Sequence, residues 1–180
     1  FVQRGIEMVL KILGSIIVLI SSTFLGFVLS RDCARRPQEL RELQRLFQMF
    51  ENEVLYLSNL LSDAFENIAK STDNEVGVFF KSALKNLNSG NGITASAVWE
   101  RAVKENIKFT ALNKEDEYIL ISFGKMLGNS DMEGQLKNIR LTLNQLKLQE
   151  QKAEEVRSKN EAMYKRLGFL GGAVLVLIFI

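Results

Sequence analysis

The chain has 180 residues, a formal net charge of +2 and 47 % hydrophobic residues, with no histidine and one cysteine. A charge this small, without a basic stripe interleaved with aromatic side chains, argues against nucleic-acid binding. The lack of histidine removes the commonest general base and metal ligand, and one cysteine excludes an internal disulfide and any multi-cysteine zinc site. We therefore expect a non-enzymatic protein without a cofactor. Its single proline and few β-branched runs favour helices.

The N-terminal part of the chain contains the longest uncharged stretch. Residues 1–7 precede Met8 and are interpreted as a leader or an expression remnant. From Ile12 to Leu29 the chain has eighteen residues without a charge, which follow Lys11. At about 1.5 Å per residue this run reaches roughly 27 Å, close to the thickness of the bilayer hydrocarbon. The run predicts a first transmembrane helix over residues 8–30.

Three alternatives to a membrane helix fit this run less well. A helix packed on the core of a soluble domain would have polar residues at helical spacing along one side, and this run has no such polar face. A cleaved signal peptide has a shorter apolar region of about 7–15 residues and a small-residue cleavage site, which is missing here. A lipoprotein would have small neutral residues before Cys33, which instead follows Arg31 and Asp32. We treat Cys33 as a bystander.

The middle of the chain predicts a helical head. Apolar residues recur at steps of three and four in six segments, which is typical of one buried face per helix. Trp99 is expected in the core together with Phe79 and Phe80. The last helix has a narrow coiled-coil seam, and its polar stretch from Gln149 to Lys159 is expected to project beyond the bundle. The six segments cover about 37–57, 60–68, 75–87, 94–103, 113–127 and 131–166.

The C-terminal residues 167–180 are apolar and predict a second transmembrane helix. Fourteen residues reach only about 21 Å, so the bilayer would thin or the preceding turn would enter it. Basic residues follow the first span and precede the second, and positive charge collects on the cytoplasmic side. This bias predicts a hairpin topology with residues 31–166 in the cytoplasm. The residues expected to flank the membrane are Lys11, Arg31, Arg35, Arg36, Lys165 and Arg166.

Several short motifs occur in a characteristic order between the two apolar ends. Residues 36–44 read RPQELRELQ and residues 50–56 read FENEVLY; Leu127-Gly128, Asp131, Gln135-Leu136-Lys137 and Ile139-Arg140-Leu141 follow. Together with the apolar ends, they resemble the stage III sporulation protein AB family of endospore-forming bacteria, over essentially the whole chain from Met8.

That family in turn resembles the cytoplasmic domain of type II secretion inner-membrane platform proteins, a small antiparallel six-helix bundle. The resemblance implies an all-α fold: two transmembrane helices flanking a cytoplasmic antiparallel six-helix bundle with a long last helix. Two features depart from platform proteins. The turn before the last helix reads GNSDMEGQL over residues 128–136 instead of the Gly-Glu-x-Ser-Gly pattern, and there is one bundle instead of two.

The resemblance also implies a function. The protein would be a non-enzymatic platform or scaffold of a secretion-like channel between mother cell and forespore, with its head in the mother-cell cytoplasm. Its partners would be a secretion-type ATPase, other membrane proteins of the channel and the lipid bilayer, with homo-oligomer formation left open. The alternative hypothesis is a membrane-bound regulator or sensor that signals through the long C-terminal coiled-coil helix.

The polar residues that are the best candidates for a binding site lie around the start of the last predicted helix. One interpretation is a docking surface for a partner or another subunit. The other is helix capping by Asp131, acidic residues favoured at a helix N-terminus, and ordinary solvated side chains. Consecutive carboxylates at residues 115–117 diverge around a helix and do not form a cation site. The candidate partner-binding residues are Asp131, Glu133, Gln135, Lys137 and Arg140.

Overall fold

The computed structural model describes residues 13–18, 20–24, 34–57, 61–88, 93–128 and 131–179. Within these ranges the regular elements are helices and there is no strand, so the predicted all-α class is confirmed for the described chain. The chain divides into two compact units. One, the head, comprises residues 36–153, and the other comprises the two flanks, residues 1–35 and 154–180.

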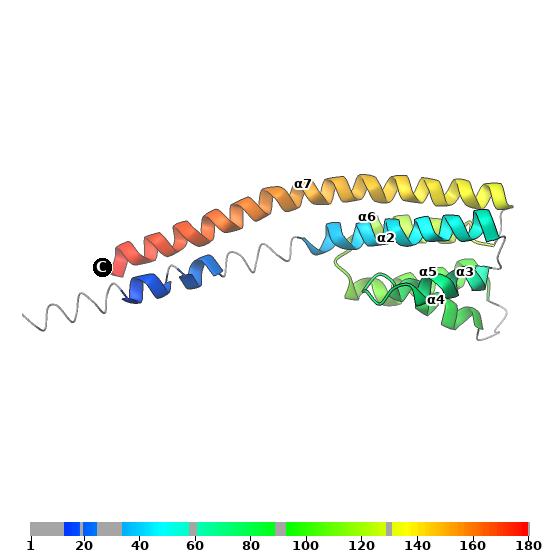
Figure 1. Cartoon of the computed structure of the whole chain (residues 1–180), viewed down its shortest axis with the longest axis horizontal. Coiled ribbons are helices and arrows are strands. Elements are labelled where there is room, and N and C mark those ends of the chain that lie inside the picture. Colours follow the sequence, from blue (N-terminus) through cyan, green and yellow to red (C-terminus); the bar gives the residue numbers. More distant parts are fainter. Residues whose placement is uncertain are drawn as a thin grey trace, which may run out of the picture. The chain divides into compact units, whose positions relative to one another are not determined.

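Each of the six predicted helical segments overlaps one helix (Figure 1), but the bounds differ, and the last helix continues past residue 166 to Phe179. A π-helical turn, Glu53–Leu57, continues α2, and a 3-10 turn, Ile107–Phe109, follows α5. Consecutive helices from α3 to α6 pack against one another in pairs. These helices are α2 (Arg35–Asn52), α3 (Leu61–Lys70), α4 (Val78–Asn88), α5 (Ala95–Asn106), α6 (Lys114–Gly124) and α7 (Met132–Phe179). Residues 13–18 and 20–24 are also helical.

Polar side chains define where three of these helices begin. The Thr94 hydroxyl accepts a hydrogen bond from the backbone of Ala97 at the start of α5. Asn113 and Asp116 form a reciprocal capping box on α6, which satisfies backbone N–H groups that the first helical turn leaves unpaired. Asp131 accepts from the backbone N–H of Gly134 at 2.9 Å, as a cap of α7.

Aromatic side chains fill the centre of the head. Trp99 is fully buried, and its indole N–H donates to the Leu120 carbonyl at 2.7 Å. Phe79 and Phe80 are also fully buried, as predicted from their helical spacing. Edge-on and stacked ring pairs of this kind add to the stability that buried area provides. The rings that contact Trp99, with centroids 5.0–6.2 Å away, are Phe47, Phe65, Phe80 and Phe123.

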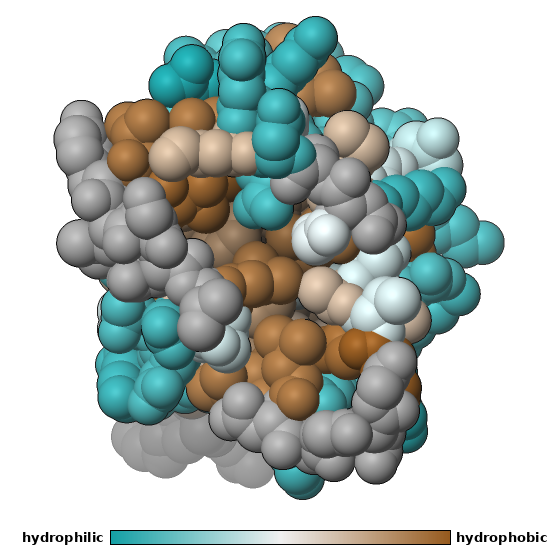
Figure 2. All heavy atoms as spheres, turned by 90° about the vertical axis from the view of Figure 1, so that its right-hand side faces the viewer, coloured by the Kyte–Doolittle hydropathy of each residue, from teal (hydrophilic) through white to brown (hydrophobic). Residues whose placement is uncertain are grey.

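The apolar core reaches the end of the head at which α7 begins. Figure 2 looks onto this end and shows hydrophobic side chains gathered in the middle, with hydrophilic ones around them. Leu127 is nearly fully buried here, whereas Met126 is half exposed. Gly128, the next residue, has φ +76°, a left-handed conformation that glycine adopts without strain.

The structure corrects the first part of the prediction for the polar stretch from Gln149 to Lys159, whereas residues 154–159 lie outside the head. Gln149 and Ala153 are buried, and both belong to the head. The prediction failed because it judged Gln149 by polarity alone. Its amide is hydrogen-bonded to Arg36 and Glu115, and a buried amide with partners is tolerated in a core.

In the flanking unit, the Ser22 hydroxyl donates to the Gly168 carbonyl at 2.6 Å. Among the described residues, no helix is both long enough and apolar enough to cross a bilayer. The predicted spans over 8–30 and 167–180 include residues 8–12, 19, 25–30 and 180, which lie outside the described ranges. Lys11, Arg31 and the side chain of Lys165 also lie outside them. The two spans therefore stay predictions.

The contact between α6 and Trp99 generates a stability prediction. A Cβ atom on Gly124 would lie 2.4 Å from Cδ1 of Trp99, whose ring is enclosed by other rings and has no room to move. We expect Gly124→Ala to lower the free energy of unfolding by about 1–3 kcal/mol, the usual cost of overpacking. Thermal unfolding followed by circular dichroism measures this change. Ser122→Ala, at a half-buried position of the same helix, should stay within about 0.5 kcal/mol. An unaltered Gly124→Ala protein would contradict this account of the core.

Candidate functional site

One guanidinium group joins three helices of the head. Arg36, in the first turn of α2, donates from Nε to Oδ2 of Asp116 at 2.8 Å and from Nη2 to Oδ1 at 3.0 Å. The same Nη2 donates to Oε1 of Gln149 on α7 at 3.0 Å. The Asp116 side chain is completely buried, and that of Arg36 is 21 % exposed. We call Arg36, Asp116 and Gln149 the polar clamp.

The first turn of α6 also stabilises the buried Asp116 carboxylate. Asp116 is the third residue of α6, and its Oδ2 also accepts from the backbone N–H of Asn113 at 2.9 Å. The carboxylate therefore receives hydrogen bonds from Arg36 and from the helix start, where the helix dipole also favours negative charge. These partners compensate for the loss of hydration that burial of a carboxylate entails.

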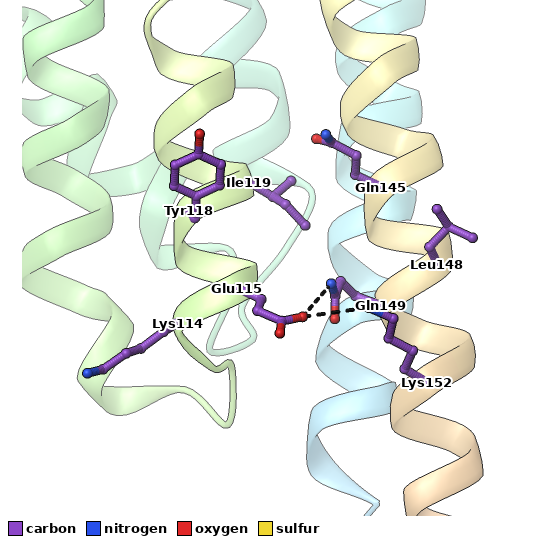
Figure 3. A pocket seen from close by; sticks show the side chains of 8 residues that line it. All are labelled: Lys114, Glu115, Tyr118, Ile119, Gln145, Leu148, Gln149 and Lys152. Carbon is purple, nitrogen blue, oxygen red and sulfur yellow. Dashed lines mark hydrogen bonds and ion pairs between the residues drawn. The ribbon is translucent and has the colours of Figure 1, made fainter.

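Polar contacts continue outward from the clamp. The Gln149 amide donates to Oε2 of Glu115 at 2.9 Å, and the Lys152 ammonium lies 3.7 Å from the same oxygen (Figure 3). On the other side of α7, Glu150 accepts from Arg41 of α2 at 2.7 Å. These outer pairs are solvated and contribute little individually, whereas the clamp itself is shielded from water.

A cavity of about 490 Å³ adjoins the clamp between α6 and α7. Figure 3 shows Ile119 pointing from α6 toward α7, and Lys114 pointing away from α7. Ile119 is buried, whereas Tyr118 and Leu148 are 68 % and 59 % exposed. We call this depression, with Tyr118, Ile119, Leu148 and Lys152 among its lining residues, the α6–α7 groove.

Three of the five predicted partner-binding residues, Glu133, Lys137 and Arg140, lie on one exposed side of α7, whereas Asp131 and Gln135 do not. Asp131 caps α7, and Arg140 donates to Oε1 of Glu51 on α2 at 2.6 Å. Glu133 and Lys137 are exposed. Gln135 is half-buried and lies two positions before Lys137, which is a turn of about 200° around the helix. Binding of a partner by these residues stays a prediction.

The predicted membrane-flanking arginines differ in their surroundings. Arg35 and Arg166 are exposed. The guanidinium of Arg36, which sequence analysis interpreted only through the membrane border, is bonded to Asp116 and Gln149. Sequence reasoning missed the clamp because its members lie 80 and 113 residues apart. The available signals were an arginine at a helix start and an aspartate in a capping position.

The resolved pKa shifts of carboxyl groups belong to surface ion pairs. A hydrogen bond from Arg45 lowers the pKa of Glu42, and Lys81 lowers the pKa of Asp73 in the same way. A lowered pKa keeps these carboxylates ionised at neutral pH, which is unsuited to a general acid. In the described part of the chain, no group of three or more Asp, Glu, Cys or His residues is placed to hold a metal ion.

Two arginines of α2 allow a matched test of the clamp. Arg36→Ala would leave the Asp116 carboxylate buried without its charged partner, and we expect a loss of about 3–5 kcal/mol in the free energy of unfolding. Arg41→Ala removes a 49 % exposed side chain from an ion pair with the same helix α7, and should cost about 0–1 kcal/mol. Denaturant titration of both variants compares the two losses. Equal effects would refute the importance of the clamp.

Comparison with known proteins identifies the family. A sequence model of stage III sporulation protein AB matches residues 11–180. The stage III sporulation protein AB of Bacillus subtilis (strain 168) is 34 % identical over 169 residues, which cover 94 % of this chain and 98 % of that protein. A solved structure of stage III sporulation protein AB has a TM-score of 0.65 and 30 % identity, and the match covers 69 % of this chain and 98 % of that one. The chain therefore belongs to the stage III sporulation protein AB family.

Proposed function

We propose that this chain is a non-enzymatic platform component of a secretion-like channel between mother cell and forespore during sporulation. Family membership supports a sporulation role. The observation that carries the platform function is the polar clamp, because a platform must hold its surfaces in a fixed arrangement. Arg36 is the first residue of the head, and Gln149 lies one helical turn before its last residue, Ala153. The two side chains are hydrogen-bonded to each other in the clamp.

The proposed placement in the membrane follows the hydropathy and charge of the sequence. Residues 8–30 and 167–180 are proposed as transmembrane helices, and residues 31–166 as a cytoplasmic antiparallel six-helix bundle on the mother-cell side. In this topology the clamp would join the two points at which the chain leaves the head for the bilayer. The proposed partners are a secretion-type ATPase, other membrane proteins of the channel and further copies of the chain.

The second candidate function is a regulator or sensor that signals along α7. One observation favours it: α7 is a single helix of 48 residues, Met132–Phe179, and belongs to both compact units. A continuous helix can transmit rotation or translation between two parts of a protein. The platform and regulator hypotheses differ in what a change of helix phase should do.

Insertion of one residue after Lys159 separates the two hypotheses. It rotates the rest of α7 by about 100° without touching the clamp, because Lys159 is exposed and lies beyond the head. For a platform we expect copurification of channel membrane proteins and the yield of heat-resistant spores to fall together. A loss of spores with copurification unchanged would favour the regulator and contradict the platform.

A four-residue insertion at the same place is the matched control. Four residues turn the helix by about 400°, which leaves its phase only about 40° from the original. This variant lengthens α7 more than the single insertion does, so it separates the effect of rotation from that of length. We expect it to retain more assembly and more spores than the one-residue insertion.

A further inference from the structure

The outward side of α7 over residues 137–152 carries positive charge only. Every charged residue that is exposed in this range is basic: Lys137, Arg140, Lys147 and Lys152. The acidic residue of the same range, Glu150, is half-buried and bonded to Arg41. This side of α7 therefore presents a positive surface that extends about four helical turns.

Two of these four basic residues are not neutralised within the described part of the head. In the described part of the chain, Lys137 and Lys147 make no ion pair. Lys152 lies 3.7 Å from Glu115, near the limit for an ion pair, and both side chains are exposed. Arg140 is paired with Glu51 at 2.6 Å. Lys137 and Lys147 are therefore available to attract an acidic partner.

Exposed apolar side chains lie along the same surface. Leu141 and Leu148 are 56 % and 59 % exposed, and their spacing of seven residues places them on one side of α7, about 10.5 Å apart. Tyr118 of α6, 68 % exposed, lies across the α6–α7 groove, whose floor includes the buried Ile119. Apolar anchors in a groove with a charged rim are typical of sites that bind an amphipathic helix.

We propose that the α6–α7 groove and the basic side of α7 bind an acidic amphipathic helix of another protein. Two apolar residues of that helix, seven positions apart, would contact Leu141, Leu148 and Tyr118. Aspartate or glutamate residues beside them would pair with Lys137 and Lys147. The proposal deepens the platform function, on which it rests, by stating the chemistry of one partner.

The same observations disfavour other occupants. A second copy that docked through the same surface would bring the unpaired Lys137 and Lys147 of both copies into one interface, and like charges in an interface are costly. An anionic bilayer would also attract the lysines, but a flat surface would leave the open groove of about 490 Å³ between α6 and α7 unfilled. A convex helix fits a depression of this kind.

Site-specific photo-crosslinking in the full-length protein tests the proposal. A photoreactive phenylalanine analogue replaces Leu148 in the native host during spore formation, and the crosslinked segment is identified by mass spectrometry. We expect a segment of another protein with apolar residues at positions i and i+7 and flanking aspartate or glutamate. Crosslinks to lipid, to a second copy, to a basic or neutral segment, or to nothing would each overturn the proposal.

Charge reversal tests the electrostatic part. The double variant Lys137→Glu and Lys147→Glu should lower the crosslink yield by roughly three- to tenfold, since two attractive pairs become repulsive. Lysine substitutions at the flanking acidic residues of the partner should restore it. The matched control reverses two exposed lysines elsewhere, Lys85→Glu and Lys108→Glu, and should leave the yield unchanged. A yield that does not respond to charge reversal on α7 would contradict the proposal.

Copurification in the same cells separates failure of this site from failure of the platform function. If channel membrane proteins still copurify while Leu148 gives no protein crosslink, the docking site is wrong and the platform function stands. If no channel protein copurifies with the unaltered chain, the platform function is wrong as well.

Discussion

The complete burial of the Asp116 carboxylate is the constraint on which the arrangement of α2, α6 and α7 depends. A buried carboxylate needs both a counter-charge and hydrogen-bond donors, and here Arg36 supplies the charge while Asn113 adds a backbone donor. Arg36 is also hydrogen-bonded to Gln149. The need of Asp116 for a charged partner therefore fixes both the first turn of α2 and the part of α7 where the head ends. The aromatic core also stabilises the head, but it fixes the relative positions of the helices less strictly. Apolar packing tolerates rearrangement more readily than a bidentate ion pair does.

The proposed platform function would make use of this arrangement. The clamp and the aromatic core occupy the interior, which leaves the outer sides of α6 and α7 free for contact. The α6–α7 groove is an apolar depression beside a basic helix face, and we propose it as the site that binds a partner helix. A platform in a sporulation channel would use a rigid head of this kind to bring an ATPase and membrane proteins together. The long continuous α7 is the feature that platform and regulator hypotheses interpret differently.

Local sequence predicted those parts of the fold that depend on neighbouring residues. Helical spacing identified six segments, placed Trp99 in the core and assigned Asp131 to the cap of α7, because these properties depend on residues within about two turns. The same reasoning missed the pair of Arg36 and Asp116, since no local pattern links residues 80 positions apart. It also placed Gln149 in solvent, because polarity predicts exposure only when no buried partner is available. The α6–α7 groove is likewise a product of tertiary packing, so no sequence pattern indicated it.

The measurement that tests the central claim most directly is the location of the head relative to the membrane. Asp73, whose side chain is fully exposed, is replaced by cysteine in a Cys33→Ser background, which leaves one thiol in the chain. Intact sporulating cells are treated with a membrane-impermeant thiol reagent, and labelling is compared with that after lysis. The account predicts protection of Asp73→Cys until lysis, as expected for a head in the mother-cell cytoplasm within reach of an ATPase. Labelling in intact cells would place the head outside and contradict the proposed platform.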